Sequence, residues 1–274
     1  MSDYTFVTPE PIQLLVSIGK GQVELRAITT AQTRVELTGP DADQVAVSQD
    51  GRLISVVAPR QRTGFLGREP EVYVLVVLPE GSDVQTRTGS ADTVAQGTFA
   101  TCRLRSGSGD ITFDTATGPL VVESGSGDLT IERAVSHLRA KAGSGDVRIG
   151  RCESSTVVST GSGDVAADYV EGKTVVKTGS ADVSVTECHG EVSLTSGSGD
   201  LLLGAAQAGR VVATSASGDV QVGVPSGLPV WTDISTVSGD ISSNLASTGE
   251  PSPGQDHLEL RAKTVSGDIA LRQC

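Results

Sequence analysis

Residues 124–129 read Ser-Gly-Ser-Gly-Asp-Leu, and close variants of this string return along the chain at a fixed interval. The first seven aspartates of the series lie 18 residues apart, and the last three follow at intervals of 19, 21 and 28. The ten repeat aspartates are Asp92, Asp110, Asp128, Asp146, Asp164, Asp182, Asp200, Asp219, Asp240 and Asp268. A short fixed period is typical of a solenoid, in which each repeat stacks on its neighbours.

Each repeat combines a corner with two short strands. Serine always stands two residues before the aspartate, and glycine separates the two in eight of the ten copies. Recurring glycines indicate backbone angles that a Cβ would resist, typically with positive φ. Apolar residues then alternate, as at Ile111 and Phe113, and a second apolar phase follows, as at Val122 and Val158. The sequence therefore predicts an all-β fold, a single-stranded β-helix (β-solenoid) of about ten 18-residue coils.

The repeat divides the chain into three expected segments. We expect a β cap of irregular, wider coils at 1–80, the regular solenoid at 81–222, and irregular coils with a cap at 223–274. Residues 60–70 and 244–256 are rich in turn formers and are expected to be loops. The single tryptophan, Trp231, is expected to close an apolar end rather than to bind a ligand.

Charge and hydropathy exclude several classes of partner. The net charge of −12 repels phosphate backbones, so we expect no nucleic acid partner. No apolar run is long enough to span a membrane, and the N-terminal residues lack the basic and apolar regions of a signal peptide. These features predict a cytoplasmic protein. Irregular solenoid ends disfavour end-to-end stacking, so we expect a monomer or a weak oligomer.

The four cysteines are predicted to be packing residues. Cys152, Cys188 and Cys274 each lie six residues after a repeat aspartate, where other copies have small residues such as Ala116. Cys102 falls at another repeat phase. Free cysteine behaves as a small buried apolar residue, and no metal-ligand spacing is visible.

Residues for catalysis are few. The three histidines fall at three different repeat phases, so we do not expect them to meet; they are His137, His189 and His257. Four charged residues near one turn resemble the groove of a polysaccharide-acting β-helix; they are Asp114, Asp168, Arg133 and Arg151. We favour a solvated outer face for this set, because mixed surface charge is ordinary. The sequence therefore predicts no catalytic residues, no cofactor and no enzyme activity.

The stacked aspartates allow two interpretations. If the corners stack in register, neighbouring carboxylates stand about 5 Å apart and repel by about 0.8 kcal/mol per pair in water. In the structural interpretation, each carboxylate accepts hydrogen bonds from turn N–H groups or from the serine two residues earlier. In the alternative, Ca²⁺ binds between coils at the ten aspartates. The calcium-binding solenoid repeat has a different spacing, so we favour the structural interpretation and expect no metal.

The chain resembles a known bacterial family. The resemblance rests on Thr-Gly-Ser-Gly-Asp-Val at 18-residue spacing, on Gly223–Pro225 followed by Ser238–Ile241, and on Phe6–Pro9 and Val77–Gly81. It is similar to the β-strand-repeat family of unknown function called "putative adhesin", the toastrack-like Ser-Gly-Asp repeat domain. The resemblance implies a single-stranded β-helix without established catalytic residues. Related domains are joined to envelope-stress modules, which implies a sensing or interaction surface.

Three functions remain open at this stage. The favoured one is a non-catalytic β-solenoid scaffold that binds an unidentified protein partner, linked by the resemblance to stress signalling. Its candidate surfaces are the aspartate ladder and the loop at 244–256. The alternative is an exported, cation-dependent adhesin whose aspartate ladder binds Ca²⁺. A polysaccharide-acting enzyme that uses Asp114 or Asp168 is the third.

Overall fold

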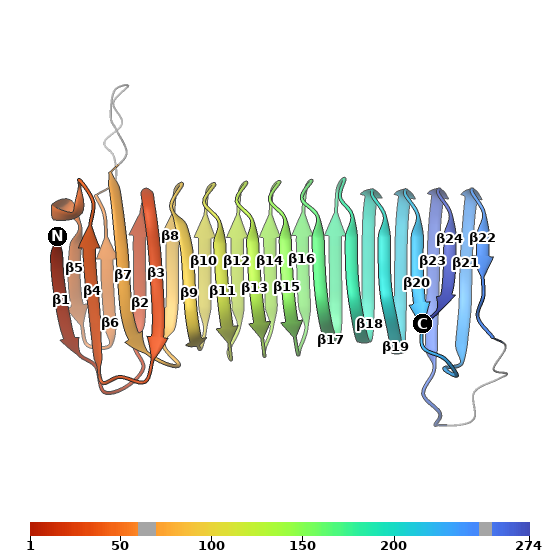
Figure 1. The fold of residues 1–274 in the computed structure, drawn as a ribbon, viewed down its shortest axis with the longest axis horizontal. Coiled ribbons are helices and arrows are strands. Elements are labelled where there is room, and N and C mark those ends of the chain that lie inside the picture. Colours follow the sequence, from red (N-terminus) through yellow and green to blue (C-terminus); the bar gives the residue numbers. More distant parts are fainter. Residues whose placement is uncertain (60–69, 247–253) are drawn as a thin grey trace, which may run out of the picture. The chain divides into compact units, whose positions relative to one another are not determined.

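The computed structural model describes residues 1–59, 70–246 and 254–274, and most of them lie in β-strands (Figure 1). These ranges contain no α-helix and one 3₁₀ turn, Ala42–Gln44. The chain forms two compact units, Met1–His137 and Leu138–Cys274. The boundary between them falls inside the segment 81–222 that the sequence predicts to be one regular array. The expected loop at 60–70 and the centre of the expected loop at 244–256 lie outside the described residues.

Thirteen strands build the first unit. They are β1 (Ser2–Val7), β2 (Gln13–Ile18), β3 (Lys20–Ile28), β4 (Gln32–Thr38), β5 (Ala46–Asp50), β6 (Leu53–Val57), β7 (Glu71–Pro79), β8 (Asp83–Thr88), β9 (Asp92–Phe99), β10 (Cys102–Ser106), β11 (Ile111–Ala116), β12 (Leu120–Ser124) and β13 (Leu129–Ala134).

Eleven strands build the second unit. They are β14 (Leu138–Ala142), β15 (Val147–Cys152), β16 (Thr156–Thr160), β17 (Val165–Thr178), β18 (Val183–Ser198), β19 (Leu201–Ser217), β20 (Val220–Val224), β21 (Val230–Ser238), β22 (Ile241–Ser243), β23 (Leu258–Ser266) and β24 (Ile269–Gln273).

Parallel pairing at the repeat spacing holds each unit together. In the first unit, β11 pairs with β13 so that Ile111 lies opposite Leu129; in the second, β17 pairs with β18 so that Val165 lies opposite Val183. Side chains alternate between the core and solvent. The residue directly after each of the first eight repeat aspartates is buried, and it is apolar in every case, as at Ile111, except at Thr93. The prediction of an all-β, solenoid-like fold is therefore confirmed.

Close packing, rather than a left-handed backbone, requires glycine in the regular corners. Gly109, Gly127 and Gly163 do not adopt the left-handed φ region, so the prediction of positive φ is wrong for them. A Cβ built on Gly163 would instead collide with the carbonyl oxygen of Gly145 in the coil before. Only in the last corners does φ turn positive, for example 155° at Gly267. Glycine therefore sets how closely successive corners stack.

The N-terminal strands do not stack in chain order. β2 lies between β6 and β8, and β3 lies between β7 and β9, all in parallel pairings (Figure 1). Strand β4 then pairs antiparallel with β7, β1 pairs antiparallel with β4, and β5 pairs antiparallel with β6. Residues 13–28 are therefore interior strands of this unit, and its outer strands are β1 and β5.

The C-terminal coils exchange places in the same way. β23 lies between β19 and β21, and β24 lies between β20 and β22 (Figure 1). The sequence predicts that the corners of Asp219, Asp240 and Asp268 stack in chain order. This prediction is wrong, because the corner of Asp268 lies between the other two. The last coil in the sequence is thus not the last coil in space.

The cysteines follow the predicted pattern with one exception. All four thiols are free. Cys152 and Cys188 occupy the small buried slot after the corner, as Ala116 does in its repeat, and Cys102 is buried in β10. Cys274, predicted to fill the same slot, is exposed, although its N–H still donates to the Val224 carbonyl oxygen at 3.0 Å. The packing prediction is therefore wrong for Cys274 alone.

We expect only Cys274 to react with a thiol reagent in the folded protein. Burial raises the pKa of Cys102 and of Cys188 to about 12, so neither forms the reactive thiolate at about pH 8. Cys152 is fully buried. Titration with Ellman's reagent should therefore detect one thiol in the native protein and four in denaturant. Native Cys274→Ser should show none, and rapid labelling of a second native thiol would contradict the structure.

Candidate functional site

The repeat aspartates form hydrogen-bonded ladders along the corners. In the first unit, the Asp110 N–H donates to Asp92 Oδ1 at 3.0 Å and the Asp128 N–H donates to Asp110 Oδ1 at 2.8 Å. The second unit repeats this bond from Asp146 through six further aspartates at 2.8–3.0 Å. Each bond joins the carboxylate of one coil to the backbone of the next, so the ladder braces neighbouring coils.

This geometry refines the structural interpretation of the ladder. The donor is a backbone N–H, as expected, but it belongs to the next coil rather than to the same turn. Several of the Ser or Thr side chains before the corners are buried and bond the corner itself; Thr160 Oγ1, for instance, accepts from the Gly163 N–H at 3.2 Å. The bond to a charged acceptor offsets the repulsion between stacked carboxylates. The ladder is therefore part of the coil-to-coil contact.

The described residues contain no three His, Cys, Asp or Glu side chains that gather closely enough to hold a metal ion. Within the same ranges, no helix has the length and apolar character needed to cross a membrane.

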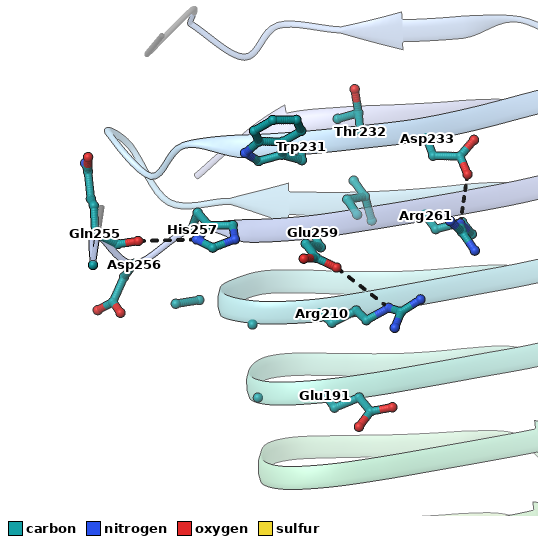
Figure 2. A pocket seen from close by; sticks show the side chains of 15 residues that line it. Glu191, Arg210, Trp231, Thr232, Asp233, Gln255, Asp256, His257, Glu259 and Arg261 are labelled. Carbon is teal, nitrogen blue, oxygen red and sulfur yellow. Dashed lines mark hydrogen bonds and ion pairs between the residues drawn. The ribbon is translucent and has the colours of Figure 1, made fainter. Parts of the chain in front are cut away.

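A groove of about 1180 Å³ opens on the outer face of the second unit's last coils (Figure 2). Trp231 and Asp233 reach it from β21, Glu259 and Arg261 from β23, and Arg210 from β19. Because β23 lies between β19 and β21, three strands that are far apart in the sequence supply adjacent side chains. The exchanged order of the coils thus creates this surface.

Trp231 provides the apolar part of the groove. Its side chain stands on the outer face of β21 and is 55% exposed, so the prediction that it closes an apolar end is wrong. Trp231, Asp233 and Ser235 alternate along β21, so their side chains lie on the same side of the strand, and all three are exposed. Ile234 faces inward. This alternation is visible in the sequence and could have placed the indole on the outer face.

Paired charges surround the indole. Arg261 Nε lies 2.8 Å from Asp233 Oδ2, and Arg210 Nε lies 3.9 Å from Glu259 Oε2 (Figure 2). Each pair joins two strands across the outer face, where solvent exposure limits its contribution to stability to about 0–1 kcal/mol. His257 stands at the groove's end, with Nδ1 3.3 Å from the carbonyl oxygen of Gln255. The groove thus offers an aromatic surface framed by guanidinium and carboxylate groups.

The other sequence-derived candidates are divided between the two units. Asp114 lies in the first unit, where Oδ2 accepts a hydrogen bond from the Gly97 N–H, while Asp168 lies in the second unit and is exposed. Arg151 stacks 3.9 Å from the Tyr169 ring centroid and bonds Glu153. Of the other charged and histidine candidates, Arg133 and His137 lie in the first unit. His189 lies in the second unit, with Nε2 2.8 Å from Glu187 Oε1.

Comparisons with known proteins describe what the chain is similar to. The family model described as "Toastrack DUF4097" matches residues 13–272. None of the curated proteins matches the sequence.

Several solved structures share similarity at low sequence identity. A "putative lipid binding protein" from Parabacteroides distasonis ATCC 8503 is 10% identical with a TM-score of 0.49, covering 100% of this chain and 96% of its own. A "putative adhesin" from Bacteroides fragilis NCTC 9343 is 9% identical with a TM-score of 0.42, covering 98% and 96%. A second "putative adhesin" from Parabacteroides distasonis ATCC 8503 is 11% identical with a TM-score of 0.39, covering 100% and 96%.

Removing one carboxylate from the ladder should weaken the fold measurably. Asp164 accepts the Asp182 N–H and donates its own N–H to Asp146. We expect Asp164→Ala to lower the free energy of unfolding by about 1 kcal/mol, because the amide of the next coil loses its acceptor. Asp164→Asn keeps an oxygen acceptor and removes charge repulsion, so its stability should stay close to that of the wild type.

Urea unfolding followed by circular dichroism measures the difference. Asp168→Ala is the matched control, since Asp168 is an exposed aspartate in the same repeat, and its effect should stay within about 0.5 kcal/mol. Equal losses for Asp164→Asn and Asp164→Ala would show that charge, not the hydrogen bond, supports the ladder.

Calcium should leave the melting temperature unchanged. Each of these ladder bonds occupies Oδ1 with a backbone N–H, and a ligand stabilises a protein only by preferring the folded state. Thermal melts in EDTA and in millimolar CaCl₂ should therefore coincide, with NaCl added to match ionic strength. A rise of many degrees in Ca²⁺ would instead support the exported, cation-dependent adhesin with calcium at the aspartate ladder.

Proposed function

The chain belongs to the Toastrack DUF4097 family, and on that premise we propose that it is a non-catalytic module that binds a protein partner through the groove around Trp231. The observation that carries this proposal is the exposed indole among paired charges on the outer face of β19, β23 and β21. The proposed recognition surface is on the last coils of the second unit.

The residue types in the groove favour a protein partner. Tryptophan and arginine are enriched at protein interfaces and among the residues that dominate binding energy. Trp231 supplies a large apolar surface, while Arg210 and Arg261 each present a planar guanidinium on the same face. Both guanidinium groups are already oriented by a carboxylate, which lowers the entropy cost of binding. The groove is thus partly organised before a partner arrives.

The chemistry of the groove supports binding rather than catalysis. General acid–base catalysis needs a nucleophile or base aligned with a second group that orients it. The one histidine of the groove, His257, lies beside a backbone carbonyl oxygen, and the carboxylates Asp233 and Glu259 face arginines. These arrangements fit a recognition surface with fixed charges.

Trp231→Ala should weaken partner binding strongly without unfolding the protein. The wild-type chain, immobilised and exposed to lysate of its source cells, should retain a protein partner that mass spectrometry identifies. We expect Trp231→Ala to weaken binding of that purified partner by about 30-fold or more, because a central tryptophan contributes about 2 kcal/mol or more. Val157→Ala is the matched control, since Val157 is an exposed apolar residue of the same unit outside the groove.

The single tryptophan also reports binding directly. Trp231 emission in the free protein should be that of a hydrated indole, and it should shift to shorter wavelength when the partner covers the groove. A partner that binds Trp231→Ala as tightly as the wild type, or leaves the emission unchanged, would show that the groove is not the binding surface.

A further inference from the structure

Strand β21 has an open edge. Within the described residues β21 pairs with β23 alone, and β22 pairs with β24 alone. An unpaired edge presents a row of N–H and C=O groups to which another strand can add. Strand β21 is nine residues long, whereas β22 has three, so β21 offers the main template.

The phase of the hydrogen bonds shows which residues face this edge. The Leu258 N–H donates to the Pro229 carbonyl at 2.9 Å, and Leu258 lies opposite Val230 in the parallel register. In a parallel ladder, a residue such as Leu258 bonds to the residues before and after the one opposite it. The N–H and C=O of the opposite residue itself point to the other side of its strand. The even-numbered residues of β21 therefore direct their backbone groups to the open edge. They are Val230, Thr232, Ile234 and Thr236.

The edge lacks the features that keep edge strands single. Residues Val230–Ser238 contain no proline, lysine or glycine, and their single charge, Asp233, is balanced by Arg261 at 2.8 Å. Trp231 is 55% exposed and Val237 is 81% exposed. Behind the strand, a hollow of about 380 Å³ is lined by apolar residues that include Leu228 and Ile234. An unprotected edge with this much exposed apolar surface is suited to pairing with a partner strand.

The sequence of β21 matches itself when reversed. An antiparallel pair centred on Ile234 aligns all nine residues, placing Thr232 opposite Thr236 and Trp231 opposite Val237. Thr232 then faces Thr236 and Ile234 faces its own copy as hydrogen-bonded pairs, as an antiparallel ladder requires, whereas Ser238, opposite Val230, already accepts from the Gly267 N–H. Asp233 lies opposite Ser235 in this alignment, whereas a pair centred on Asp233 would oppose two carboxylates. A two-fold axis generates this kind of self-complementary contact.

We propose that a second copy of this chain covers the edge, with the two β21 strands paired antiparallel about a two-fold axis at Ile234. Ile234, on the axis, and Ser243 of β22 line the same hollow. The dimer buries Val237 of each copy against Trp231 of the other and closes both hollows at once.

Charge substitutions at Ser235 test the pairing. Ser235 is exposed and faces Asp233 of the partner subunit in the proposed register. Sedimentation equilibrium of the full chain should show a molar mass that rises from 28.0 kDa toward twice that value with concentration. Ser235→Asp opposes like charges twice across the axis and should raise the dimer Kd by about two- to thirtyfold, whereas Ser235→Lys should lower it.

Proline at the open edge provides the second test. The Thr232 N–H points away from β23, so Thr232→Pro removes a bond to the second copy and none among the described residues. Thr232→Pro should be monomeric by sedimentation, while Thr232→Val, which keeps the N–H, should still dimerise. In the wild type, the amides of Thr232, Ile234 and Thr236 should exchange more slowly with deuterium as concentration rises.

Three results would overturn the proposal. The first is a monomer at every concentration up to about 100 μM, since a useful dimer must form in the micromolar range. The second is a dimer whose Kd responds equally to Ser235→Asp and Ser235→Lys, which would place the interface elsewhere. The third is slow deuterium exchange of the edge amides in the dilute monomer, which would mean that another part of this chain covers the edge. Slow exchange only after a different protein is added would likewise assign the edge to that protein.

Discussion

Hydrogen bonding between equivalent residues of successive coils holds each unit together, and it fixes how long a repeat can be. A residue such as Val165 pairs with the residue one repeat later, so an insertion in one coil must loop out or move every later side chain off its face. Other regularities follow from this register. Position 163 requires glycine because the corner of the preceding coil lies against it. Asp164 accepts a hydrogen bond from the Asp182 N–H because the corner of the next coil stacks on its own. The corner motif is thus a set of contacts between coils rather than an isolated turn.

The sequence predicted most of the fold because periodicity is a local property. The alternation after each corner predicted which face is buried, and residues such as Ile111 and Cys152 are buried as expected. The exchange of β23 and β21 could not be predicted this way, since the corners of Asp240 and Asp268 carry the same Ser-Gly-Asp sequence, although only that of Asp268 bonds to Asp219 in the described structure. Their order depends on the connecting segments. Exposure of Cys274 had the same origin, because the motif does not show where the last coil stops.

The candidate groove was also hidden from the sequence, although each of its residues was visible. Arg210, Trp231 and Arg261 come from three strands whose adjacency exists only after β23 has inserted. Regular coils place similar side chains one above another, which suits stacking and offers a partner little to distinguish one coil from the next. Recognition is better served where the period fails, and the tryptophan lies in such a coil. In this family member, regularity supplies stability and irregularity supplies a surface.

The exchanged coil order has a consequence for how the chain reaches its native state. During synthesis β21 emerges before β23, although in the fold β23 pairs with β19 and β21 pairs with β23. A chain that stacks β21 on β19 first must reopen before β23 can enter. The correct ladder contains a bond between Asp268 and Asp219, 49 residues apart, which forms only when the final coil is available. Long-range closure of this kind is slow, so the last coils are exposed to kinetic trapping and to exchange between chains.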